Sequence, residues 1–322
     1  MAHVLIAGRI HQAGLAVLEA RAGLTFEVLD AADEASIAPR VQDADAILLR
    51  TAPLTATAID AAPRLKVVSR HGVGFDNVNL EALTRRRIPL ALAVGANAVS
   101  VAEQALFMML ELAKRGRSAD RVVRENEWQQ RDGLGAFELL GKRLLVVGFG
   151  RIGREVAARA RAFGMSIVVH DPQLSTSQVT DLGYGFAPDL HLALTEVDVV
   201  SLHLPRTPDT VGMIGREALA RMKPSAIVIN TARGGLIDEL ALAEALAEGR
   251  LNGAALDVFD VEPPPPDHPL YKLPNVLLSP HLGALTQEAA QRMAAVAAEH
   301  ILAGLDNRLD RAVVANPEVL SM

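Results

Sequence analysis

The amino-acid sequence predicts an α/β protein made of two doubly wound parallel-sheet domains. Short runs of leucine and β-branched residues alternate with alanine-rich stretches of helical period, which is typical of βαβ units. Runs such as LLVVG and AIVIN are almost continuously apolar, as expected for strands that helices cover on both faces. The chain has 322 residues, and at about 150 residues per domain this length favours two domains.

The predicted strands fall into two series. The first begins near Val4, Phe26, Ala46, Lys66 and Pro89, and the second near Leu144, Ser166, Val197, Ala226, Gly253 and Val276. A last helix, near 286–305, follows the final strand of the second series, and we expect it to fold back onto the first domain. The expected division is therefore a discontinuous domain, 1–97 and 288–322, with a second domain, 98–287, inserted between its parts.

One long helix is predicted at the junction, over residues 98–114 (AVSVAEQALFMMLELAK). Its polar residues fall on one narrow stripe, at Ser100, Glu103, Gln104, Glu111 and Lys114. The rest is apolar, so we expect the helix to be buried nearly all round. With the following segment as far as Gly135, which contains Trp128, it has more apolar surface than one small domain needs. We expect a homodimer interface here.

Composition narrows the function classes. The formal charge is −6 and no basic block occurs, so neither nucleic acid nor an anionic membrane is expected as a partner. Without cysteine, the chain has no disulfide, no thiolate nucleophile and no sulfur-ligated zinc, and no metal site is predicted. The N-terminus lacks a signal-peptide pattern, and no run of about 18 apolar residues occurs. A cytoplasmic location is expected.

The hexapeptide GFGRIG (148–153) follows the strand LLVV and opens the helix REVAARARAFG. In this setting Gly148 allows a tight turn, Gly150 lets the backbone approach a pyrophosphate, and Gly153 lets helix and strand pack closely. The N–H groups at the start of the helix then hold the phosphates. The motif predicts a dinucleotide-binding Rossmann domain. The competing interpretation is a glycine-rich turn without a ligand.

Asp171 ends the next strand, SIVVH, and lies 171 − 153 = 18 residues after the last glycine. A carboxylate here accepts hydrogen bonds from the adenosine ribose hydroxyls and repels a 2′-phosphate. No arginine follows it directly, so NAD is favoured over NADP. The alternative is a plain turn aspartate before Pro172.

Three further side chains suit acid–base chemistry on a substrate that carries a carboxylate. Arg233 follows the strand AIVIN, and its planar fork can bridge carboxylate and carbonyl oxygens. His281 follows VLLSP, and imidazole titrates near the working pH of a proton donor and acceptor. Glu262, before the proline run, can orient this histidine and favour its charged form. The competing interpretations are a surface ion pair, a helix N-terminal histidine and a solvated loop acid, respectively.

Several motifs carry a family resemblance: RHGVGFDNV (70–78), NAVSVAE (97–103), the glycine hexapeptide, NTARGGLID (230–238), ALDVFDVEP (255–263) and SPHLGALT (279–286). Over nearly its whole length the chain resembles D-2-hydroxyacid dehydrogenases, the group that contains phosphoglycerate dehydrogenase and hydroxypyruvate reductase. The resemblance implies an NAD-dependent oxidoreductase with a flavodoxin-like substrate domain, 1–97 and 288–322, and a Rossmann NAD-binding domain, 98–287. It also implies that Arg233 binds the substrate and that His281, paired with Glu262, is the general acid and base.

The resemblance further implies contacts to the cofactor and the substrate. The matching cofactor positions, beyond the glycines and Asp171, are Arg151, Ile152, His203, Leu204, Pro205, Thr231, Ala232, Asp257, Gly283 and Ala284. Asp257 is expected to bind the nicotinamide carboxamide, or else to be a strand-end aspartate. The N–H groups of Val73 and Gly74 are expected to hold the substrate carboxylate. Arg50 and Arg70 are candidates for the distal group of the substrate.

Some positions depart from the relatives. Relatives that oxidise phosphoglycerate carry an arginine two residues after the tryptophan that matches Trp128, whereas this chain has Gln130 there. The chain length is also expected to leave no room for their C-terminal regulatory domain. These departures argue against phosphoglycerate, and Glu262 argues against formate. A second function stays open, a non-catalytic NAD-binding regulator of the same fold, which the absence of an appended interaction segment disfavours.

Overall fold

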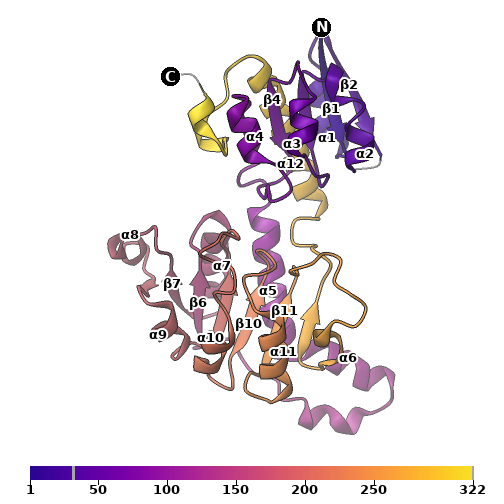
Figure 1. Ribbon diagram of the computed structural model, residues 1–322. Helices are drawn as coiled ribbons and strands as arrows, with labels where there is room; N and C mark the ends of the chain where they lie inside the picture. The colour runs from indigo at the N-terminus through magenta and orange to yellow at the C-terminus, as the bar shows by residue number, and fades with distance from the viewer. Residues whose placement is uncertain (31–32, 321–322) are drawn as a thin grey trace. The chain divides into compact units, whose positions relative to one another are not determined.

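The structure is a computed structural model that describes residues 1–30 and 33–320. The chain forms two compact units. The first unit contains Met1–Asn97 and the chain from Leu285 onward, and the second unit contains Ala98–Ala284. Figure 1 shows both units, coloured along the chain. The assignment of the substrate to one domain and the cofactor to the other stays a prediction.

The first unit contains a five-stranded parallel sheet in the order β2-β1-β3-β4-β5. Its strands are β1 Ala2–Ala7, β2 Leu24–Leu29, β3 Ala46–Leu49, β4 Val67–Arg70 and β5 Leu90–Leu92. Its helices are α1 Gln12–Glu19, α2 Glu34–Ile37, α3 Ala56–Asp60, α4 Leu80–Arg85 and α12 Gln287–Leu305. Neighbouring residues of one strand, such as Leu5 and Ile6, point into two different apolar clusters, so the sheet is buried on both faces. As expected, α12 returns to this sheet and packs on α1 and β4.

The second unit contains a seven-stranded parallel sheet in the order β12-β11-β10-β9-β6-β7-β8. Its strands are β6 Arg143–Val147, β7 Ser166–His170, β8 Gly185–Phe186, β9 Val199–Leu202, β10 Ile227–Asn230, β11 Gly253–Leu256 and β12 Val276–Leu278. Its helices are α5 Ala98–Lys114, α6 Gly116–Arg124, α7 Arg151–Ala162, α8 Thr176–Thr180, α9 Leu190–Leu194, α10 Arg216–Arg221 and α11 Glu239–Ala247. Leu144 and Val146 point toward α5 and α7, whereas Leu145 and Val147 point into a second cluster on the opposite face. The predicted class, two doubly wound α/β domains, is therefore confirmed.

The strand predictions agree with the structure except at one place. Each of the eleven predicted runs contains a strand that begins within two residues of the predicted start. The sequence analysis missed β8, which has only two residues and pairs with the outer side of β7. So short a strand leaves no hydrophobic period in the sequence.

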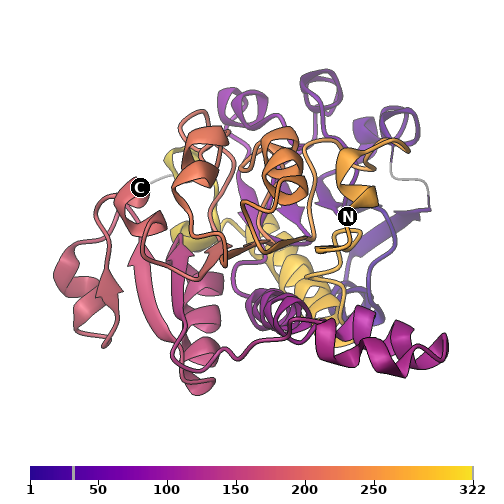
Figure 2. The same ribbon diagram turned by 90° about the horizontal axis from the view of Figure 1, so that it is seen from below.

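The bounds predicted for α5 agree with the structure, and most of its apolar residues are buried in the isolated chain. Val99 and Phe107 are exposed in the isolated chain, at 39% and 53%. Ser100 does not lie on the exposed polar stripe, because its side chain is buried. After α5, the segment 116–133 runs along the side of the unit in both views (Figures 1 and 2). No helix in the described ranges is both long and apolar enough to cross a membrane.

Candidate active site

The predicted site residues of the second unit gather at one edge of its sheet. All seven strands are parallel, and each site segment follows the carboxyl end of a strand. Between β6 and β9 the order of the strands in the sheet reverses direction along the chain. In open α/β sheets ligands bind outside the carboxyl ends of the strands, at this switch point. The glycine hexapeptide follows β6, directly beside the switch.

Glycine stands at each of the three positions of the hexapeptide for a different structural reason. Gly148 has a φ of 89°, and an added Cβ would lie 2.6 Å from the carbonyl oxygen of His203. At Gly153 an added Cβ would lie 2.1 Å from the carbonyl oxygen of Gly148, so only glycine fits. At Gly150 it would meet no atom within 4 Å, and no side chain caps α7 there. Open space in front of uncapped helix N–H groups suits a pyrophosphate.

The residues that follow or face the glycine turn differ in their exposure and contacts. Arg151, the first residue of α7, is exposed, whereas Ile152 is partly buried against the cluster beneath α5 and α7. Asp171 follows β7 and accepts hydrogen bonds from the backbone N–H of Phe149, at 2.9 Å, and from that of Gln173, at 2.9 Å. The carboxylate is therefore fixed beside the glycine loop. Each carboxylate oxygen keeps acceptor capacity for a further hydroxyl group.

Two buried side chains near the switch point have polar atoms without a hydrogen-bond partner among the described residues. His203 bonds Ser201 through Nε2, at 2.8 Å, but its Nδ1 has no hydrogen-bond partner in the described ranges. Burial lowers the pKa of His203 to about 3, so its imidazole is neutral. The Oγ1 of Thr231, which follows β10, is also buried and has no hydrogen-bond partner in the described ranges. Leu204 is partly buried against the core and Pro205 is exposed.

Arg233 is held by a short turn that follows β10. The strand ends at Asn230, whose side chain accepts a hydrogen bond from Ala232 N–H, at 3.0 Å, and donates one to the carbonyl oxygen of Arg233, at 2.8 Å. Ala232 is buried and Arg233 is partly exposed. At Gly234 an added Cβ would lie 1.8 Å from the carbonyl oxygen of Phe259, so glycine is required where this turn meets the loop after β11.

Glu262 and His281 form a direct pair. The Oε2 of Glu262 lies 2.8 Å from the Nδ1 of His281, and its Oε1 accepts the N–H of Phe259, at 3.0 Å. Burial alone would raise the pKa of the Glu262 carboxyl. The hydrogen bonds from His281 and Phe259, with the charges of His281 and Arg233, outweigh burial and hold this pKa below its usual value. Glu262 is therefore a carboxylate near neutral pH.

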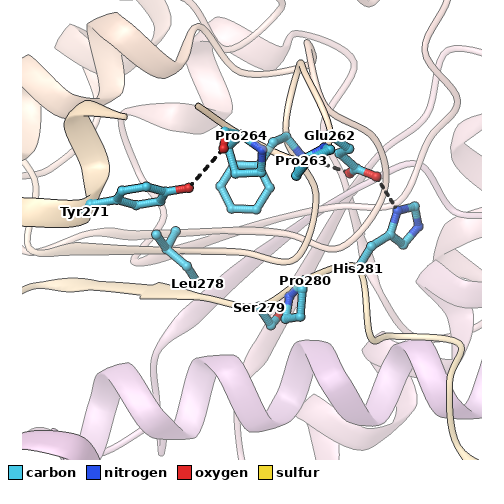
Figure 3. Close-up of a pocket in the computed structure, with 9 residues that line it drawn as sticks. Glu262, Pro263, Pro264, Tyr271, Leu278, Ser279, Pro280 and His281 are labelled. Atoms are coloured by element: carbon cyan, nitrogen blue, oxygen red, sulfur yellow. Dashed lines mark hydrogen bonds and ion pairs between the residues drawn. The ribbon is translucent and has the colours of Figure 1, made fainter. Parts of the chain in front are cut away.

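A cavity of about 440 Å³ adjoins this pair (Figure 3). In the figure, Glu262 and His281 face one another at one end of the cavity, whereas Tyr271 and Leu278 lie at the other end. The remaining lining residues are Phe259, Pro263, Pro264, Ser279 and Pro280. The walls are therefore largely apolar, and Glu262 with His281 supplies the polar groups at one end.

Asp257, expected to bind the cofactor, is engaged within the protein. It is fully buried at the end of β11, and its carboxylate accepts the N–H groups of Leu282 and Gly283, both at 2.8 Å. The hydroxyl of Ser279 also donates to it. Gly283 is buried and Ala284 is partly buried. The structure thus gives Asp257 a role in holding the loop of His281, which the sequence analysis missed.

The four predicted substrate residues lie in the first unit. Arg50 follows β3 and donates to the carbonyl oxygen of Arg9, at 3.3 Å, and Arg70 ends β4 and donates to that of His71, at 2.9 Å. Burial, together with the charges of Arg50 and Arg70, lowers the pKa of His71 to about 4. Val73 and Gly74 follow in a partly exposed loop. Arg233, Glu262 and His281 all lie in the second unit.

Comparison with protein families shows where the chain belongs. Residues 106–283 match the model of the D-isomer specific 2-hydroxyacid dehydrogenase, NAD binding domain. This segment is more than half of the chain and contains the glycine loop, Arg233, Glu262 and His281.

The chain belongs to the D-2-hydroxyacid dehydrogenase family.

Individual relatives agree with this placement. The chain is 39% identical over 320 residues to the D-3-phosphoglycerate dehydrogenase of Methanocaldococcus jannaschii, and the match covers 99% of this chain and 60% of that protein. It is 42% identical to the glyoxylate reductase of Korarchaeum cryptofilum, with 83% and 81% covered. The chain thus spans little more than half the length of the phosphoglycerate dehydrogenases that it matches.

A solved structure supports the fold. The NADPH-dependent glyoxylate/hydroxypyruvate reductase of Sinorhizobium meliloti, in complex with NADP and malonate, superimposes with a TM-score of 0.86 at 27% identity. The match covers 100% of this chain and 98% of that chain. A protein of the same architecture therefore binds NADP.

Proposed function

We propose that the protein is an NAD-dependent D-2-hydroxyacid dehydrogenase that reduces a small 2-keto acid with His281 as proton donor. The observation that supports this most strongly is the 2.8 Å contact between the Glu262 carboxylate and the Nδ1 of His281. This contact uses one ring nitrogen and leaves Nε2 for proton transfer. Arg233 adds a positive charge beside the same pair, since its charge acts on the Glu262 carboxyl.

The proposed steps follow from these side chains. The guanidinium of Arg233 binds the carboxylate and the carbonyl oxygen of the keto acid, and so orients the carbonyl carbon. The bound nicotinamide supplies the hydride. As negative charge develops on the carbonyl oxygen, the Nε2–H of His281 donates its proton to that oxygen. Glu262 stabilises the imidazolium before the transfer and orients its ring. Oxidation of the hydroxy acid runs through the same groups in reverse.

We propose NAD as the preferred cofactor. The fixed carboxylate of Asp171 suits ribose hydroxyls and repels a 2′-phosphate, and no cationic residue occurs in 172–178. The open space at Gly150 and the uncapped start of α7 fit the pyrophosphate. We also retain as proposals the roles of the remaining cofactor positions, from His203–Pro205 and Thr231–Ala232 to Asp257 and Gly283–Ala284.

For the substrate, we propose a small 2-keto acid other than phosphohydroxypyruvate. Gln130 stands where the phosphoglycerate-oxidising relatives have arginine, and this difference supports the exclusion. Val73 and Gly74 would hold the carboxylate, and Arg50 and Arg70 are the candidates for a distal polar group. The charges of both arginines act on His71 of the substrate loop.

A homodimer through the segment 98–135 is proposed as well. Phe107, Val123 and Trp128 are 53%, 54% and 55% exposed in the isolated chain, which supports a covering partner. The cytoplasmic location and the absence of nucleic-acid and membrane partners stay predictions from the sequence.

A substrate panel tests the function. The purified protein is mixed with NADH or NADPH and one of several keto acids: glyoxylate, hydroxypyruvate, phosphohydroxypyruvate and bulkier 2-keto acids. Oxidation of the cofactor is followed at its absorbance band. We expect turnover with at least one small keto acid and a loss of about 10²- to 10⁴-fold in H281A, which should still bind NADH. NADH binding without turnover on any acid would favour the non-catalytic regulator instead.

A further inference from the structure

The backbone at His281 has an unusual conformation. The residues Ser279–Gly283, here called the histidine loop, follow β12, and His281 has a φ of 54°. This left-handed region is uncommon for any residue other than glycine. A residue keeps such a conformation only when its surroundings fix it, so the contacts of the loop identify what places the imidazole.

The contacts on one side of the loop come from Asp257. Its carboxylate accepts the N–H groups of Leu282 and Gly283, and its carbonyl oxygen accepts the N–H of His281, at 2.8 Å. The hydroxyl of Ser279 donates to the same carboxylate. These bonds lie on both sides of His281 along the chain.

The contacts on the other side come from α5. The hydroxyl of Ser100 donates to the carbonyl oxygen of Gly283, at 2.6 Å, and the Nε2 of Gln104 donates to the Oγ of Ser279, at 3.2 Å. Residues four apart lie on the same face of a helix, so α5 contacts both ends of the loop with one face. Ser100 is only 4% exposed although it is polar. This burial is explained by its bond to the loop.

The place of the Ser100–Gly283 bond in the chain explains why the histidine loop needs it. The second unit begins at Ala98 and ends at Ala284, so Ser100 and Gly283 lie next to the two points where the chain crosses between the units. The histidine loop is therefore the last segment of its unit. Without an anchor at Gly283, the loop would be fixed on that side only by Asp257.

We propose that Ser100 and Gln104 are positioning residues for His281. They fix the histidine loop so that Nδ1 stays on Glu262 and Nε2 is left for proton transfer. Neither side chain needs to contact substrate or cofactor. The proposal rests on the proposed role of His281, and it assigns the NAVSVAE segment a function in placing the proton donor.

Three variants separate positioning from stability. S100A removes the hydroxyl, S100T keeps a hydroxyl, and L112A is the control. Leu112 is buried on the same helix, but it packs near Gly253 at the start of β11, whereas the histidine loop follows the opposite ends of the strands. For S100A we expect kcat for the keto acid to fall about 10-fold, with KM changed less than about 2-fold. S100T should recover at least half of the lost turnover, and L112A should lower the melting temperature without this loss.

A second readout does not depend on activity. In histidine-labelled protein, the ring signal of His281 is assigned by its absence from H281Q and compared between the variants by NMR. We expect it to shift or broaden in S100A and further in the S100A/Q104L double variant, but to stay in place in L112A. The proposal would be overturned if the His281 signal in S100A and in S100A/Q104L matched that of the wild type, and if the turnover of both variants were no lower than that of L112A. If the wild type reduces no keto acid, the proposed function fails, while the NMR comparison still decides whether α5 positions the imidazole.

Discussion

Replacing Glu262 with glutamine tests the acid–base pair most directly. Glutamine keeps the size of the side chain and an oxygen acceptor, but it removes the negative charge that faces the Nδ1 of His281. The pKa of Glu262 lies below its usual value, so the wild-type side chain is charged throughout the pH range of the assay. The variant therefore differs from the wild type by one full charge at every pH measured.

The size of the effect follows from the geometry. With an N–O contact of 2.8 Å, the charge centres lie about 4 Å apart, where opposite charges attract by about 1 kcal/mol in water and about 4 kcal/mol at a protein surface. The side chains of His281 and Glu262 are 49% and 38% exposed, so solvent screening favours the lower part of this range. We take about 1.5 kcal/mol as the stabilisation of the imidazolium that the variant loses, which corresponds to a shift of about one unit in the pH dependence.

The assay is the rate of keto acid reduction by NADH as a function of pH. The protonated histidine is active in this direction, so the rate falls as pH rises. Without the carboxylate the imidazolium is less stable. The limb of the pH–rate profile on which the rate falls should therefore move to lower pH by about one unit. E239Q is the matched control, because Glu239 forms a second carboxylate–histidine pair, with His268 at 2.8 Å, and bonds the same loop at the N–H of Asp260 without bonding His281 in the described ranges. A limb that stays in place in E262Q, with turnover unchanged, would show that Glu262 is only a loop acid.

Three further predictions concern the cofactor site and acid stability. D171A should weaken NADH binding and narrow the preference for NADH over NADPH, as measured by fluorescence titration; a wild type that already prefers NADPH refutes the role of Asp171. G153A should abolish NADH binding, because its Cβ would lie 2.1 Å from the carbonyl oxygen of Gly148, and near-normal titration would contradict this. His203 has a pKa of about 3 in the folded protein and near 6.5 when unfolded, so the unfolded chain binds more protons and stability falls as pH drops from 6.5 toward 3, by about 1.4 kcal/mol per unit. Urea unfolding at pH 7 and 5 should therefore depend less on pH in H203N, and an unchanged pH dependence would count against a buried neutral histidine.

Much of this fold could be predicted because its signals are local. An apolar run marks each longer strand, and Thr286, which accepts a hydrogen bond from Ala289, marks the start of α12. The glycine turn could also be predicted, since a close approach of backbone to backbone at Gly153 admits no other residue. The strand β8 could not, because two residues have no period.

The contacts that fix the loops of the proposed site were not predictable in the same way. The bond between Ser100 and Gly283 joins residues 183 positions apart, and its donor resembles an ordinary exposed helix serine in the sequence. Asp257 was expected to face the cofactor, yet its oxygens accept hydrogen bonds from the histidine loop. Asn230 was not singled out, although it shapes the turn of Arg233. For Ser100 and Asp257 the partner is decided by tertiary packing, which composition and spacing do not encode, whereas the bonds of Asn230 reach only two and three residues along the chain.

The order of the strands explains how one sheet edge can serve both binding and chemistry. From one side of the sheet, the carboxyl ends of β12, β11, β10, β9, β6 and β7 lead to His281, Glu262, Arg233, His203, the glycine loop and Asp171, in that order. The proposed proton donor thus lies toward one end, the proposed phosphate site at the switch point, and the proposed ribose-binding carboxylate toward the other end. At about 4.8 Å per strand, five intervals separate the strands of His281 and Asp171 by about 24 Å. Substitutions this far apart, without shared partners, usually have additive effects, so we expect a change at Asp171 to leave the Glu262–His281 pair undisturbed.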